Sequence, residues 1–396
     1  MATGPHTCYN TPGSMTCIGD TNTMDMMERM LDAEKPDLVV YSGDNVDGLT
    51  SNDAFSTIVK YSRPVVERGI PWTIIFGNHD EEGDLSREEM MSTVQDLPYS
   101  LSQRGPLHIS GTGNYVLSIH KHRRKRAHRQ GFDNNQNEGE EETRLDDSDE
   151  NDIQSRNGLF HLYFLDSGAY SFNLKYPGWD WIKEDQVEWF RQTSRVITSR
   201  YATDDIPNAL AFFHIPIPEY NDLGDDNEDD DNDDDDLKEK NNVRMVGDKA
   251  EGVSAPSYNS GMFDAFLESK DVRATTAGHD HLNDYCLNHH GINLCYGGGL
   301  GYGTYGSPTI PRRSRVFEIR NNGDRVDTWK RLDDEDMTLV NQQTLFVGKK
   351  SPSSAHGRPS NGRSGKSTRP KNRQDSDLYE SLRQGAQYVM NGLIGH

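Results

Sequence analysis

Four stretches of this sequence share one design, in which a short apolar run of the kind that forms a buried strand ends on polar side chains. Those side chains are, in chain order, Asp44, Asn78, His214, and His279 together with His281. Carboxylate and amide oxygens and imidazole nitrogens suit hard or borderline metal ions. Open α/β sheets bind their ligands beyond the carboxyl ends of the strands, so we expect the four stretches to converge on one metal site. A single such stretch would fit a strand and a polar turn equally well.

The order of the motifs carries a family resemblance. Gly-Asp-x-x-Asp stands at 43–47, Gly-Asn-His-Asp at 77–80, a lone histidine at 214 and Gly-His-x-His at 278–281. This order resembles the calcineurin-like metallophosphoesterase superfamily, and the stretches at 32–40, 214–220 and 295–299 look like its fungal and plant branch related to purple acid phosphatases. The resemblance covers residues 20–332 apart from two insertions. It implies an α/β fold of two stacked mixed β-sheets flanked by helices, a four-layer α/β/β/α sandwich.

The resemblance also implies a dinuclear centre of Mn, Fe or Zn ions and a role for each site residue. Two cations roughly 3.5–4 Å apart would neutralise a phosphoester and acidify a water molecule. Asp44 would bridge the ions; Asn78, His214 and His279 would bind the second ion, and His281 the first. His79 would protonate the leaving oxygen or stabilise the charge of the transition state. Asp47 would orient His79, as the aspartate at this spacing does in the related serine/threonine phosphatases.

One family motif is missing. Members of the family begin with a strand that ends in Asp-x-His, and both residues bind the first metal, but no Asp-x-His precedes Asp44 in this chain. Either the chain lacks its true amino end or the first metal site is degraded, and the intact remaining ligands favour the first explanation. The first ion keeps Asp44 and His281, whereas a stable site typically has three or four protein ligands. We therefore expect one ion to bind well, a second to bind weakly, and phosphatase activity to be low.

Helices and strands alternate around the motifs, which predicts a mostly parallel or mixed sheet. We expect helices over 21–35, 52–68, 181–196 and 260–269, and one that begins with a capping box of Ser86 and Glu89. A hairpin around Asn322-Gly323 should close the domain at residue 332. The glycine-rich stretch 301–306 matches a dinucleotide-binding fingerprint in letters but opens no helix, so we reject that interpretation.

The rest of the chain is polar. The net charge is −22, and two acidic blocks carry most of it. We expect disorder in insertions at 121–156 and 222–242 and in most of a basic tail over 333–396, while residues 1–20 form an irregular amino end. The acidic block after Asp222 lacks the glycine and the final glutamate of a calcium-binding loop.

The four cysteines leave the compartment open. Cys8 with Cys17 and Cys286 with Cys295 could form disulfides in an exported protein, but we expect free, partly buried thiols. The sequence shows no recognisable signal peptide, no run long enough to span a membrane and no Asn-x-Ser/Thr sequon. These features favour a cytoplasmic protein without a membrane partner.

The sequence thus predicts a phosphomonoesterase or protein phosphatase that acts through a metal-bound hydroxide on a phosphorylated protein or small molecule. One alternative is a catalytically impaired binding or regulatory protein on the same fold, which the missing motif supports. Another is a metal-dependent nuclease or phosphodiesterase, which should have a basic groove lined by aromatic residues. The acidic blocks disfavour nucleic acid as a partner, and the sequence leaves the oligomeric state open.

Overall fold

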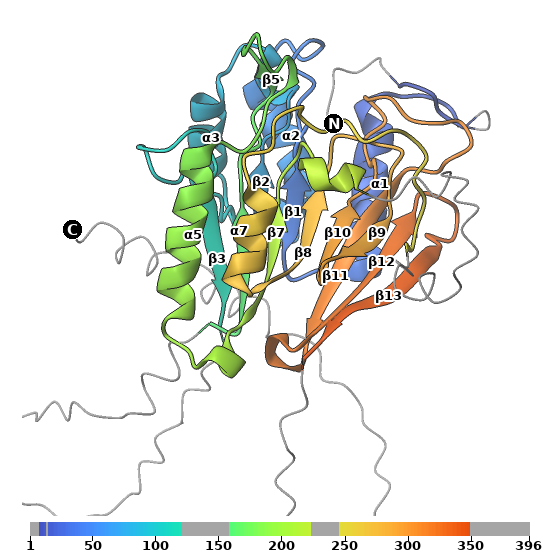
Figure 1. Cartoon of the computed structure of the whole chain (residues 1–396). Helices are drawn as coiled ribbons and strands as arrows, with labels where there is room; N and C mark the ends of the chain where they lie inside the picture. The colour runs from blue at the N-terminus through green and yellow to red at the C-terminus, as the bar shows by residue number, and fades with distance from the viewer. Residues whose placement is uncertain (1–7, 13–14, 121–157, 223–244, 349–396) are drawn as a thin grey trace, which may run out of the picture.

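Two layers of β-sheet lie face to face, and helices cover the outer side of each layer (Figure 1). The structure is a computed structural model that describes residues 8–12, 15–120, 158–222 and 245–348. The predicted four-layer α/β/β/α sandwich is confirmed. The insertion 121–156, nearly all of 222–242 and the tail from residue 349 lie outside the described residues.

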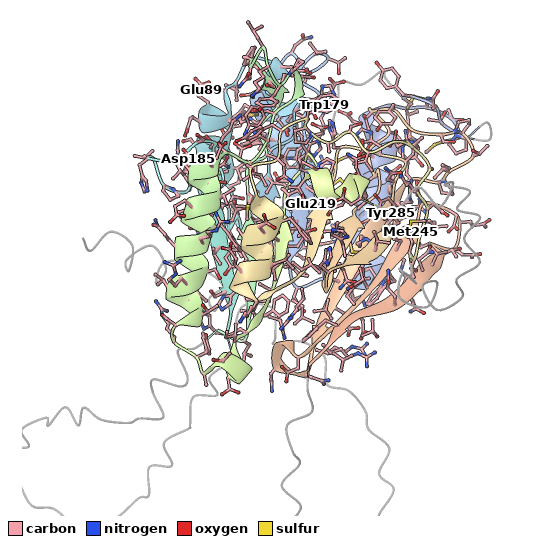
Figure 2. The ribbon with its side chains drawn as sticks, in the orientation of Figure 1. Glu89, Trp179, Asp185, Glu219, Met245 and Tyr285 are labelled. Carbon is pink, nitrogen blue, oxygen red and sulfur yellow. A yellow bond between two sulfur atoms is a disulfide. The ribbon has the colours of Figure 1, made fainter. Side chains whose placement is uncertain are left out.

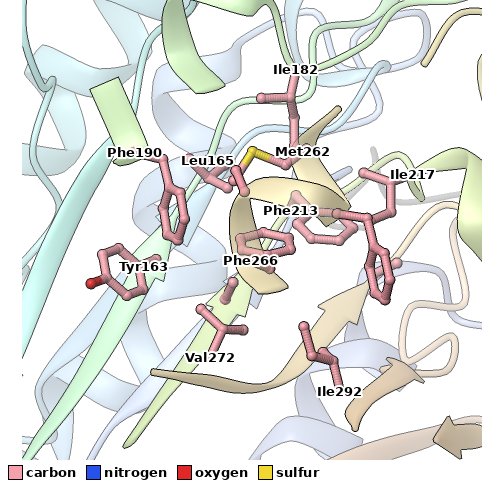
Figure 3. Packing of buried hydrophobic residues seen from close by; sticks show 14 of the residues in the cluster. Tyr163, Leu165, Ile182, Phe190, Phe213, Ile217, Met262, Phe266, Val272 and Ile292 are labelled. Carbon is pink, nitrogen blue, oxygen red and sulfur yellow. The ribbon is translucent and has the colours of Figure 1, made fainter. Parts of the chain in front are cut away.

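The larger layer is a six-stranded mixed sheet in the order β3-β4-β7-β8-β10-β9. Its strands are β3 (Tyr115–Ile119), β4 (Phe160–Phe164), β7 (Asn208–Phe212), β8 (Val272–Ala277), β10 (Ile292–Tyr296) and β9 (Cys286–His289). The four central strands are parallel, while β3 and β9 pair antiparallel at the two edges. Helices α5 (Glu184–Thr198) and α7 (Met262–Ser269) cover its outer face. Phe266 of α7 packs between Phe190 of α5 and Phe213, which follows β7 (Figure 3).

The second layer consists of two separate sheets, where the sequence predicted one mixed sheet. The first is the parallel pair β1 (Val39–Ser42) and β2 (Trp72–Ile75), and the second is the antiparallel sheet of β11 (Arg313–Arg320), β12 (Arg325–Leu332) and β13 (Leu339–Val347). Both pack on the six-stranded sheet through one apolar cluster. The helices on the outer side of β1 and β2 are α1 (Asp20–Glu34), α2 (Ala54–Glu67) and α3 (Arg87–Asp96).

Two small strands, β5 (Tyr170–Ser171) and β6 (Gly178–Trp179), form a hairpin. The short 3₁₀ turns are η1 (Asp80–Glu82), η2 (Thr203–Asp205), η3 (Pro218–Asn221) and η4 (Asn321–Gly323).

A cavity of about 860 Å³ lies between β1 and β11. Among the described strands β1 pairs with β2 alone, and β11 pairs with β12 alone. The cavity is apolar on both of its other sides, where it is lined by Leu162, Leu210 and Phe212 of the six-stranded sheet and by Met27, Met30 and Leu31 of α1. One end of the cavity reaches Asp44. The edge of β1 that faces away from β2 is therefore open to a slot with apolar walls.

The predicted helices agree with the structure to within two or three residues at each end, and the capping box of Ser86 and Glu89 is present. The predicted domain boundary at residue 332 was wrong. Strand β13 continues the second layer to Val347, because it pairs with β12 and inserts Leu345 into the core between the sheets. Its alternation of polar and partly buried residues is the pattern of a strand with one face exposed, which the polar composition of the segment concealed.

The expectation of free thiols was also wrong. Cys8 is bonded to Cys17, and Cys286 is bonded to Cys295. The second disulfide joins directly opposed positions of β9 and β10, so the strand register places the two sulfur atoms together.

Candidate metal centre

The loops that leave β1, β7 and β8 at their carboxyl ends bring three predicted ligands together. Asp44, His214 and His279 are buried, and their ligand atoms all lie within 4.8 Å of one another. Nε2 of His281 lies 3.8 Å from Oδ2 of Asp44, at the margin of this cluster. The expected convergence of these four residues is thus observed, although 237 positions separate Asp44 from His281 in the numbering.

Each histidine of the cluster is oriented through its Nδ1 atom. Nδ1 of His214 donates to the carbonyl oxygen of Ser42 at 2.8 Å, and Nδ1 of His279 lies 2.9 Å from Oδ1 of Asn78. Nε2 of His214 is buried 3.1 Å from Oδ2 of Asp44, and Nε2 of His279 is buried without a hydrogen-bond partner. Such a nitrogen is costly to bury unless a ligand uses its lone pair. The donor set therefore fits a metal ion, and the Nδ1 contacts are the outer-shell bonds that metal-binding histidines commonly make.

The charges around the cluster favour the ligand forms of Asp44 and His279. Burial lowers the pKa of His214, but the charge of Asp44 outweighs it and raises the pKa above its usual value, so a metal ion would displace the proton of His214. Burial raises the pKa of Asp44, but the neighbouring charge of His214 outweighs it and holds the pKa well below its usual range. Burial, reinforced by the charge of His214, lowers the pKa of His279 to about 3. At neutral pH the cluster therefore presents an ionised carboxylate and a neutral His279 imidazole, the states in which these groups bind metals.

A profile of the calcineurin-like phosphoesterase family matches residues 15–283 of this sequence. The chain belongs to that family. Over 358 residues it is 36% identical to "Probable inactive purple acid phosphatase 29" of Arabidopsis thaliana, with 86% of this chain and 81% of that protein covered. Over 348 residues it is 35% identical to "Phosphatase DCR2" of Saccharomyces cerevisiae, with 85% of this chain and 52% of that protein covered. A dimetal phosphatase from Danio rerio aligns at 12% identity with a TM-score of 0.49, covering 83% of this chain and 88% of that one.

Asn78 lies beside the three-residue cluster. Its side chain is fully buried, and its Oδ1 atom, which the sequence assigned to the second metal, accepts the hydrogen bond from His279. Its Nδ2 atom donates to the hydroxyl of Tyr170 at 3.3 Å. In this structure Asn78 orients His279.

Glycine allows the ligand loops to lie in contact. A Cβ atom on Gly77 would lie 2.2 Å from the backbone nitrogen of Asp44, which no real contact permits. Asp44 and His279 themselves adopt left-handed backbone conformations, with φ of 50° and 63°. Asp80 connects the two loops, because one of its oxygens accepts from the amide of Val46 and the other from the amide of Gly77. Gly77 thus allows the loops that follow β1 and β2 to pack against each other, and Asp80 joins them by hydrogen bonds.

The predicted proton donor, His79, lies next to the cluster. Its backbone nitrogen donates to Oδ1 of Asp44 at 2.9 Å, and its Nδ1 atom lies 2.6 Å from Oε2 of Glu82. Burial lowers the pKa of His79, but the negative charges of Asp44 and Glu82 outweigh it, so the pKa lies above its usual value. A histidine with a raised pKa keeps the proton that a general acid must deliver.

The expectation that Asp47 orients His79 was wrong. Among the described contacts, the side chain of Asp47 accepts a hydrogen bond from Thr50, and its carbonyl oxygen accepts from Thr50 and Ser51. Asp47 adds only to the field that raises the pKa of His79. The carboxylate on the ring belongs to Glu82, because the 3₁₀ turn η1 that follows His79 brings residues three apart onto one side.

Further residues of the site were missed from the sequence. Trp179, at the end of the molecule that carries the β5–β6 hairpin, places its ring 4.2 Å from the ring of His279 (Figure 2). Arg87 is buried, forms an ion pair with Asp166, and donates to the carbonyl oxygens of Gly77 at 2.8 Å and Gly168 at 3.0 Å. No motif marks these residues, since each reaches the site from a distant part of the sequence. Of these residues, only Glu82 could have been found from the sequence, because it lies three positions after His79 in an acidic run.

Proposed function

We propose that the chain is a metal-dependent phosphoester hydrolase, specifically a phosphomonoesterase or protein phosphatase that acts on a phosphorylated protein or small molecule. The observation that carries this proposal is the buried cluster of Asp44, His214 and His279, whose ligand atoms lie within 4.8 Å of one another and in which Nε2 of His279 has no partner. Asp44, His214 and His279 would hold one ion, with Asn78 beside them, and Asp44 with His281 would contact a second.

Bound metal would neutralise the phosphoester and acidify a water molecule for the attack. The residues of the chain supply the rest. Asp44 places negative charge between the histidines, and Asn78 fixes the ring of His279. His79 holds a proton for the leaving oxygen beside the same carboxylate. Manganese, iron and zinc all suit this mixture of nitrogen and oxygen donors.

A catalytically impaired protein on the same fold is a second candidate. It is supported by the two ligands that remain for the first ion and by the name of the Arabidopsis relative, a probable inactive phosphatase. The name of the yeast relative, a phosphatase, supports the enzyme. A nuclease receives no such support.

Metal content and hydrolysis of 4-nitrophenyl phosphate test the proposal. We expect the purified chain to retain about one ion after dialysis, to bind a second weakly, and to hydrolyse the ester slowly in manganese. Asp44→Asn should lose both ions and the hydrolysis, whereas Asp264→Asn on the exposed side of α7 should lose neither. A chain that retains no ion would refute the proposal, and one that holds an ion without hydrolysing any phosphoester would favour the impaired protein.

A further inference from the structure

Glu82 and Tyr170 join the predicted proton donor to the predicted metal ligands through an unbroken chain of contacts. Nδ1 of His79 lies 2.6 Å from Oε2 of Glu82, and the Tyr170 hydroxyl donates to Oε1 of the same carboxylate at 2.7 Å. That hydroxyl in turn accepts from Nδ2 of Asn78, whose Oδ1 accepts from His279. Both oxygens of Glu82 are therefore used, one for each partner.

The identity of the partner decides which nitrogen of His79 can react. An ionised carboxylate only accepts hydrogen bonds, so the Nδ1 atom of His79 must carry the proton in this pair. The other ring nitrogen, Nε2, is then the atom that delivers a proton. The His79 side chain is 33% exposed whereas that of Glu82 is 16% exposed, so the ring is accessible to a reactant while its carboxylate partner is largely enclosed.

Tyr170 reaches the pair from another part of the chain. It belongs to the β5–β6 hairpin, whose second strand places Trp179 against His279. The hairpin thus contacts the proton donor through Glu82 and the metal ligands through Asn78 and Trp179. Arg87 holds both sides of this arrangement, because it binds the carbonyl oxygens of Gly77 and Gly168, which precede Asn78 and Tyr170 by one and two residues.

We propose that Glu82 is a positioning residue of this phosphoesterase, which fixes His79 so that Nε2 faces the leaving oxygen, and that Tyr170 holds Glu82 in place. This inference rests on the proposed function. As water attacks phosphorus, the bond from phosphorus to the leaving oxygen breaks, and that oxygen keeps the bonding electron pair and takes the Nε2 proton. His79 is left neutral, with its Nδ1 proton still on Glu82.

The dependence of the rate on the leaving group tests this assignment. Nitrophenolate departs with little help from an acid, whereas phenolate needs a proton. In manganese, Glu82→Gln should lower kcat for phenyl phosphate at least about tenfold, lower it less for 4-nitrophenyl phosphate, and leave KM nearly unchanged. Tyr170→Phe should give a smaller loss with the same pattern. An equal loss on both esters, or an effect confined to KM, would overturn the assignment.

The chain offers a matched control pair. Tyr258 donates to Glu184 at 2.6 Å in an exposed Tyr–Glu pair that contacts none of the site residues named above. Tyr258→Phe and Glu184→Gln should leave kcat unchanged for both phenyl phosphate and 4-nitrophenyl phosphate. This result would exclude the explanation that the loss of any Tyr–Glu hydrogen bond lowers the rate.

A second measurement does not depend on activity. In chain labelled with ¹⁵N-histidine, the Nδ1 proton of His79, assigned by its absence in His79→Gln, should give a far-downfield hydrogen-bonded resonance. Glu82→Ala should remove that resonance, while Glu184→Gln should retain it. If the resonance persists in Glu82→Ala, the positioning role is refuted even when the chain is an active phosphatase. If the wild-type chain shows the resonance but no hydrolysis, the proposed function fails and the geometry stands.

Discussion

At the scale of single residues, a nearby carboxylate distinguishes a candidate metal-binding histidine from a structural one. His161 in β4 resembles His279, since its Nδ1 atom contacts Ser118 at 2.9 Å and its buried Nε2 atom has no partner. No carboxylate oxygen completes a metal-binding cluster with His161 in the described part of the chain. An unpartnered imidazole nitrogen therefore indicates a metal site only where a carboxylate lies nearby, as Asp44 lies within 4.8 Å of His279.

His161 should make the stability depend on pH. Burial, with the nearby charges of His120 and Arg200, lowers its pKa to about 3 from an ordinary value of 6.5. The unfolded chain thus takes up a proton that the folded chain excludes. The stabilisation is complete above pH 6.5 and falls by about 1.4 kcal/mol per pH unit as the pH drops toward 3.

Urea unfolding at pH 7, 6 and 5 measures this dependence. His161→Gln should lose less stability than the wild type over this range, whereas the exposed His290→Gln should follow the wild type. Parallel pH profiles for wild type and His161→Gln would show that His161 is not the group responsible.

At the scale of elements, the strand exits are packed so closely that they leave no room for a side chain. The backbone nitrogen of Asp44 occupies the space where a Cβ of residue 77 would be, so the ends of β1 and β2 are in contact. This contact sets the spacing of the site.

Gly77→Ala should therefore damage both stability and the metal site. We expect a loss of about 1–3 kcal/mol in unfolding free energy, together with weaker metal binding, because the added methyl group pushes the Asp44 loop away. Thermal unfolding and metal analysis measure the two effects. Gly252→Ala is the matched control, since nothing lies within 4 Å of its Cβ position. Equal melting temperatures for the two variants would contradict the close packing.

The slot between β1 and β11 bears on the missing motif. Its walls are apolar on both faces, which is the environment of a strand buried in a sheet. A strand laid along β1 and ending beside Asp44 would bring its last residues to the first metal.

Adding an upstream apolar strand that ends in Asp-x-His should therefore complete both the sheet and the first metal site. The extended chain should hold two ions after dialysis, hydrolyse 4-nitrophenyl phosphate faster in manganese, and protect the amides of β1 and β11 from hydrogen exchange. The chain without the addition could instead hydrolyse 4-nitrophenyl phosphate as fast as the extended chain and lose that activity in His79→Ala. In that case the Asp-x-His motif is not needed for hydrolysis.

At the scale of the whole molecule, the disulfides bear on where the protein works. Disulfides persist in oxidising compartments and are rare in the cytosol, so the two observed here speak against the cytoplasmic location that the sequence favoured. None of the described helices is long and apolar enough to cross a membrane. We propose an oxidising compartment.

Removing the disulfide between β9 and β10 should destabilise the fold. The bond closes a loop with a sequence separation of 9, and the double variant Cys286→Ala/Cys295→Ala should lose about 2–3 kcal/mol of unfolding free energy. Urea unfolding without reductant measures the loss. Thiol titration of the wild type in denaturant should find no free thiol, and four free thiols would restore the original expectation.

The sequence by itself determined the features that depend on neighbours along the chain. An apolar run, a glycine and a ligand are adjacent in sequence, so the strand exits carrying Asp44, Asn78 and His279 could be recognised from local pattern alone. The helix periods and the capping box at Ser86 are local for the same reason.

Only the tertiary structure decided which distant groups meet. Asp47 and Glu82 each lie three residues from a motif residue, and the turn η1 rather than the spacing selects Glu82 as the partner of His79. Tyr170 and Arg87 reach the loop at 77–79 from other elements. The register of β9 against β10 decides that Cys286 and Cys295 are bonded, which the sequence left open. These contacts depend on how layers pack and strands align, which is long-range geometry that no local pattern encodes.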